Sequence, residues 1–61
     1  MSVQGEKVVG IKVINIFEES PEAIEKMFNT AINTLHEEKS KILDIQITED
    51  NIFFILGEKE P

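Results

Sequence analysis

The sequence predicts an α+β domain with the element order β-α-β-β, in which one helix packs on one face of a three-stranded antiparallel sheet. Three observations lead to this fold class: a β-branched segment near the start, a central segment with apolar residues at helical spacing, and two short apolar segments separated by turn residues. We expect the strand order 1-3-2, because the last strand is continuously apolar, as suits a central strand covered on both faces. The domain spans residues 8–57, and the polar segments 1–7 and 58–61 are expected to be flexible termini.

The first strand is predicted in the β-branched segment VVGIKVINIF, residues 8–17. Its apolar residues hold one parity up to Val13 and the opposite parity from Ile14 onward. Either a bulge near this point shifts the alternation, or the second half of the strand is apolar on both faces.

The helix is predicted from Pro21 to about Glu38. Ser20 is a favourable N-cap, and proline is tolerated at the first helical position because the N–H there has no intrahelical partner. Glu22 and Lys26 have the spacing of an ion pair across one turn. Apolar residues separated alternately by three positions and one form the buried face: Ile24, Met27, Phe28, Ala31, Ile32 and Leu35.

The remaining two strands form a predicted hairpin. Residues 42–48, ILDIQIT, alternate cleanly and place Leu43, Ile45 and Ile47 on one face. Glu49, Asp50 and Asn51 are turn-forming residues, and the apolar run IFFIL follows at residues 52–56.

One face of the predicted sheet has no cover, because a single helix shelters only one side. A two-residue hairpin loop, at 49–50 or 50–51, places Phe53 and Ile55 on the side away from the helix. A three-residue loop would place Ile52, Phe54 and Leu56 on that side instead. Ile14 and Ile16 join Phe53 and Ile55 if the other parity of the first strand faces the helix. We therefore expect an oligomer or partner interface made of Ile14, Ile16, Phe53 and Ile55.

Size and composition also favour self-association. A chain of 61 residues buries a small core, and such domains usually need a disulfide, a metal or oligomerisation. There is no cysteine and a single histidine, so oligomerisation remains, with a homodimer favoured. The net charge of −6 and the lack of arginine argue against direct binding of nucleic acid.

The residues give no sign of an enzyme, and we expect no catalytic, cofactor-binding or metal-binding residues. His36 lies beside the predicted apolar stripe without a partner for catalysis, and the three glycines form no phosphate-binding pattern. No segment resembles a signal peptide or a membrane span, so a cytoplasmic protein without membrane contact is expected.

Most of the chain, from Ile11 to Leu56, resembles the Cse-type small sporulation proteins of bacilli and their phages. The resemblance lies in IKVINIF followed by two glutamates, in the apolar pattern of the helix, and in ILDIQI. Some phage proteins of this kind look similar to inhibitors of bacterial defence systems that act by contact. The resemblance implies a protein that binds another protein, whose identity the sequence does not reveal.

A second resemblance is to dodecin, a flavin-binding shell protein with the same strand–helix–strand–strand order. VVGIKV and the segment SPEAIE are similar to its beginning, but no tryptophan is present to stack on a flavin. This resemblance implies the alternative hypothesis of an oligomeric small-ligand carrier, and flavin is not carried over to this chain.

Overall fold

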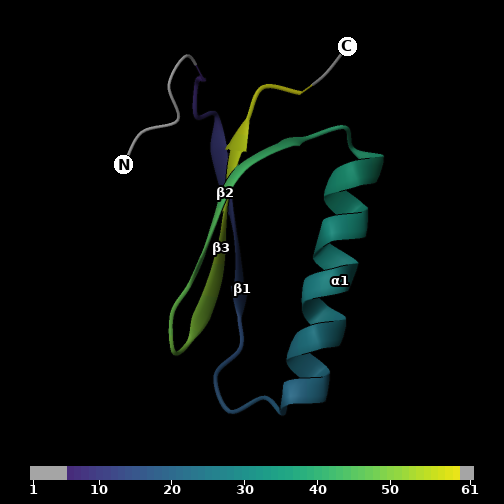
Figure 1. The fold of residues 1–61 in the computed structure, drawn as a ribbon, viewed down its shortest axis with the longest axis vertical. Coiled ribbons are helices and arrows are strands. Elements are labelled where there is room, and N and C mark those ends of the chain that lie inside the picture. The colour runs from purple at the N-terminus through teal and green to yellow at the C-terminus, as the bar shows by residue number, and fades with distance from the viewer. Residues whose placement is uncertain (1–5, 60–61) are drawn as a thin grey trace.

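The computed structural model describes residues 6–59 and confirms the predicted fold class. The elements are β1 (Gly10–Asn15), α1 (Pro21–Glu37), β2 (Lys41–Ile47) and β3 (Asn51–Gly57). The three strands form an antiparallel sheet in the order β1-β3-β2, and α1 lies along one face of it (Figure 1). The hypothesis of flexible termini concerns in large part residues 1–5, 60 and 61, which lie outside the described residues.

β1 alternates regularly along its whole length. It pairs with β3 without a register shift, from Gly10 opposite Leu56 to Asn15 opposite Asn51. Exposed and half-buried residues alternate without interruption, so there is no bulge near Val13. The strand is shorter than the predicted segment 8–17, although the backbone N–H of Ile16 still donates to the carbonyl oxygen of Asp50 at 2.8 Å.

The irregularity lies in β2 instead, where the pairing with β3 shifts between Ile42 and Asp44. Leu43 is the extra residue, and its side chain covers Gly57: a Cβ placed on that glycine would lie 3.0 Å from Leu43 Cδ2. The prediction that Leu43 shares a face with Ile45 is therefore wrong. Ile42 packs against the core instead, because a bulge shifts the alternation of side chains by one residue.

The β2–β3 hairpin closes through a two-residue loop, Glu49–Asp50, which is one of the two predicted positions. The backbone N–H of Thr48 donates to the carbonyl oxygen of Asn51 at 2.9 Å, and Thr48 Oγ1 accepts from the N–H of Asn51 at 3.1 Å. This loop places Ile52 and Phe54 on the helix side, where they are 1% and 0% exposed.

Both ends of α1 are capped. The Ala23 N–H donates to Ser20 Oγ at 3.1 Å, as the predicted N-cap requires. At the other end Lys39 has a φ of 60°, its N–H donates to the His36 carbonyl, and the Ser40 N–H donates to the Leu35 carbonyl, both at 3.0 Å. This pair of bonds is the Schellman motif, in which the left-handed position is usually glycine.

Two charge pairings differ from expectation. The predicted pair of Glu22 and Lys26 does not form, whereas Lys41 Nζ lies 2.9 Å from Glu6 Oε2. Glu6 belongs to the segment expected to be flexible, and this ion pair joins it to the first residue of β2. Exposed pairs of this kind contribute little, in general about 0–1 kcal/mol.

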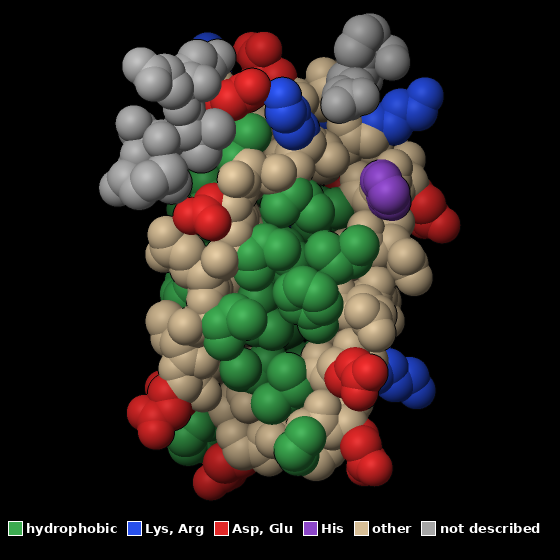
Figure 2. All heavy atoms as spheres, in the orientation of Figure 1, with side chains coloured by type: hydrophobic (Ala, Val, Ile, Leu, Met, Phe, Trp, Pro, Cys, Tyr) green, Lys and Arg blue, Asp and Glu red, His purple; other side chains and the backbone are tan. Residues whose placement is uncertain are grey.

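The core lies between α1 and the sheet and is small. Half-buried Phe28 packs against fully buried Phe54, with ring centroids 5.5 Å apart. The buried apolar residues of the core are Ile16, Ala31, Leu35, Ile52 and Phe54. The Cα envelope measures 36 × 26 × 12 Å, and apolar side chains form a continuous band between the strand layer and α1 at the surface (Figure 2). The helix–sheet interior is therefore not closed on the side seen in Figure 2.

No helix within residues 6–59 has both the length and the apolar character needed to cross a membrane.

Candidate interaction surface

The sheet face away from α1 carries an apolar cluster, which we call the outer face: Ile11, Val13, Phe53 and Ile55. Ile11 lies opposite Ile55 and Val13 opposite Phe53 in the ladder, so the four side chains form two adjacent cross-strand pairs. Ile11 is 57% exposed and Val13 is 52% exposed, whereas Phe53 and Ile55 are half-buried. Such pairs place apolar side chains in contact with one another and with solvent.

Phe53 and Ile55 lie on the outer face, as the two-residue hairpin loop requires. Ile14 and Ile16 do not lie on this face. Ile16 is a core residue at 6% exposed, and Ile14 packs against the core. The reason is the pairing of Ile14 with Ile52, which faces the helix, so the even-numbered residues of β1 face it too. The predicted inclusion of Ile14 and Ile16 in an exposed interface is therefore wrong.

Ile11 and Val13 take the place of those two residues on the outer face, and Val9 continues the same parity at 53% exposed. Sequence reasoning left these residues as the alternative because both parities of this strand are apolar. Gly10 and Lys12 would have suggested the opposite facing, because small or polar side chains are typical of the solvent side of a strand, whereas here both lie on the helix side near the start of β1.

Polar residues border the outer face on two sides. On β2, Asp44 and Gln46 lie opposite Ile55 and Phe53, and Gln46 Nε2 donates to Asp44 Oδ2 at 3.4 Å. At the end of β1, Asn15 Nδ2 donates to Asn51 Oδ1 across the ladder at 3.3 Å. An apolar centre with a hydrogen-bonded polar rim is the usual composition of a protein interface.

The titratable residues between positions 6 and 59 form no cluster that could act as a metal site. No group of three or more histidine, aspartate or glutamate residues within the described part of the chain could hold a metal ion. His36 is exposed in the last turn of α1. No buried side-chain nitrogen or oxygen among residues 6–59 lacks a hydrogen-bond partner. The outer face is therefore the most prominent candidate for function on the sheet.

Comparison with known proteins gives no relative from which a function could be transferred, so a function has to be argued from the outer face and the rest of the structure. No protein-family model matches the chain, and neither a curated protein nor a solved structure matches it significantly.

Proposed function

We propose that this chain is a non-enzymatic interaction protein that forms a homodimer through the outer face and acts by binding another protein. The observation that carries the proposal is the position of Ile11 and Val13. Both are more than half exposed on the uncovered side of the sheet, beside half-buried Phe53 and Ile55. Two outer faces packed together would give four layers, helix–sheet–sheet–helix, with the sheets about 10 Å apart.

The strength of such a dimer can be bounded from the exposed fractions. Full burial of a large apolar side chain contributes ~1.5–3 kcal/mol, so covering the exposed half of Val9, Ile11 and Val13 in both copies contributes roughly 5–9 kcal/mol. The loss of translational and rotational freedom on association costs about 4–15 kcal/mol. The gain exceeds the cost only near the lower end of the cost range, by at most about 5 kcal/mol, so we expect a weak dimer with a dissociation constant of about 0.2 mM or more.

Sedimentation velocity at increasing protein concentration tests the dimer. We expect the mass to rise from one chain towards two between about 0.1 mM and about 3 mM, as the energies above require. A single chain mass throughout this range would overturn the homodimer. A mass of six or more chains would overturn it in favour of the ring-forming carrier that the resemblance to dodecin implies.

The second part of the proposal is a different protein as partner, which takes the place of the second copy of the chain on the outer face. It is supported by the same exposed apolar residues and by the resemblance to Cse-type proteins, which suggests a sporulation-associated protein or a phage inhibitor of a bacterial defence system. A pull-down from the host with the wild type and with Val13→Glu, at low and at high salt, tests it. A partner held through apolar contact survives high salt and is lost with the variant. A partner that is released from the wild type at high salt, and that still binds the Val13→Glu variant at low salt, would contradict binding through the outer face.

A further inference from the structure

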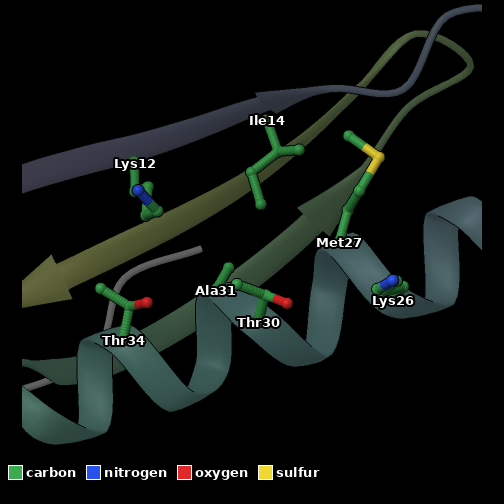
Figure 3. Close-up of a pocket in the computed structure, with 7 residues that line it drawn as sticks. All are labelled: Lys12, Ile14, Lys26, Met27, Thr30, Ala31 and Thr34. Atoms are coloured by element: carbon green, nitrogen blue, oxygen red, sulfur yellow. The ribbon is translucent and has the colours of Figure 1, made fainter.

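A groove of about 440 Å³ opens between β1 and α1, on the opposite side of the sheet from the outer face (Figure 3). Lys12 and Ile14 line it from β1, and five residues line it from the helix: Lys26, Met27, Thr30, Ala31 and Thr34. Its volume lies within the range of small-molecule sites, roughly 300–1,000 Å³.

The lining combines an apolar wall with cationic and hydroxyl groups. Ile14, Met27 and Ala31 supply the apolar part, and the two threonines supply hydroxyl groups that can donate to an anion. Two of the six lysines of a chain with net charge −6 line this groove, and no aspartate or glutamate among residues 6–59 does. The groove therefore favours negative charge on a molecule whose overall charge repels anions.

Lys12 is placed unusually for a lysine. It lies on the helix side of β1, between Gly10 and Ile14, and opposite fully buried Phe54. Its side chain is half-buried, and the aliphatic part of a lysine in such a position can cover apolar surface while the ammonium group reaches water. Within residues 6–59 neither Lys12 nor Lys26 forms an ion pair, so both ammonium groups can bind an incoming anion.

We propose that this groove binds a small organic anion with an apolar body, such as an aromatic or medium-chain aliphatic carboxylate or sulfonate. The apolar body lies against Ile14, Met27 and Ala31, and the anionic group pairs with Lys12 or Lys26, which lie towards opposite ends of the groove (Figure 3). The site is formed within one chain, so it does not depend on dimerisation.

Two fluorescent probes that differ in charge test this site. The first is 1-anilinonaphthalene-8-sulfonate, an anion, and the second is N-phenyl-1-naphthylamine, its neutral counterpart. Both are titrated in an Ile11→Glu background, so that the outer face contributes less binding. We expect Lys12→Gln and Lys26→Gln each to weaken binding of the anionic probe by about three- to tenfold and that of the neutral probe by less than about twofold.

Lys39→Gln is the matched control, because it removes the same charge from an exposed position outside the groove. An equal loss for all three lysine variants would show a general charge effect and would overturn the site. Equal weakening of the two probes would overturn the proposed role of the lysines. Lys26 lines the groove but is itself exposed, and glutamine is also a good helix former, so its variant remains informative if Lys12→Gln fails to fold.

Two further measurements complete the test. Thr34→Leu fills part of the groove without changing its charge, and we expect it to weaken both probes by about threefold or more. Decanoate, an aliphatic anion, should displace the anionic probe. Failure of decanoate to compete, or unchanged probe binding in Thr34→Leu, would show that the probes bind elsewhere. Because these results concern one chain, they hold whether or not the homodimer of the proposed function exists.

Discussion

The substitution Ile11→Glu tests the outer face most directly, because it changes the centre of that face and little of the monomer. Ile11 is 57% exposed, so a glutamate side chain at this position can remain in water in the free chain. In a dimer packed through the outer face, the same carboxylate would lie against Val13 and Ile55 or against the partner. We therefore expect the variant to fold and to remain a monomer.

The size of the effect follows from the exposed fraction. Covering the exposed half of an isoleucine contributes roughly 0.8–1.5 kcal/mol, and each dimer loses this contribution twice. The lost burial alone then raises the dissociation constant by about 15- to 150-fold. Burial of two unpaired carboxylates adds a further cost of several kcal/mol, so no dimer should be detectable at about 1 mM.

Ile47→Glu provides the matched control. Ile47 is also an isoleucine on an edge strand and is 66% exposed, but it lies opposite Ile52 and therefore on the helix side of the sheet. Sedimentation velocity of both variants and the wild type, with circular dichroism to verify folding, compares identical changes on opposite faces. We expect dimers for Ile47→Glu and monomers for Ile11→Glu. The same dissociation constant for both variants would refute the assignment of the interface to the outer face.

Three other predictions follow from charge, capping and core packing. Raising the salt concentration from about 50 mM to 500 mM should strengthen the dimer, because each chain carries a net charge of −6; a weaker dimer in sedimentation at high salt would indicate a contact driven by ion pairs. Lys39→Gly should stabilise the fold by about 0.5–1 kcal/mol in urea unfolding, because glycine adopts a φ of 60° without steric cost; Lys39→Ala, which keeps the Cβ, should give no such gain. Phe54→Ala should cost about 3–5 kcal/mol, since the side chain is 0% exposed, and should leave the chain largely unfolded by circular dichroism; native-like thermal unfolding would contradict the central place of this residue in the core.

The fold could be predicted from the sequence because each element has a local signal. Ser20 and Pro21 mark the start of the helix, the alternation in ILDIQIT marks β2, and a polar turn separates β2 from β3. The continuous apolar character of β3 gave the strand order, since only the central strand of this sheet is flanked on both sides.

The sequence does not predict which side of β1 faces the helix, because its odd-numbered and even-numbered residues are nearly equal in apolar content. Ile11 and Val13 are as hydrophobic as Ile14 and Ile16, and the choice depends on which pair meets the helix side of β3. The bulge at Leu43 is hidden for a similar reason, since both Ile42 and Leu43 could fill the same place in the core. Lys39 gives no sequence signal of a left-handed residue, because glycine is expected there.

The groove was missed because its polar residues belong to two separate elements. Lys26 has the spacing to pair with Glu22 on the helix, and Lys12 resembles an ordinary polar position of an edge strand. Only the packing of α1 against β1 brings these two lysines to the lining of one cavity (Figure 3).

The bulge in β2 has a consequence for how the chain length can vary. Ile42 faces the helix and Asp44 faces away, and both keep their partners on β3. A chain that lacked Leu43 would join these two residues in ordinary alternation, without moving any other side chain to the opposite face. Relatives one residue shorter at this point could therefore retain the same sheet, provided that a larger residue replaced Gly57 and filled the space above it.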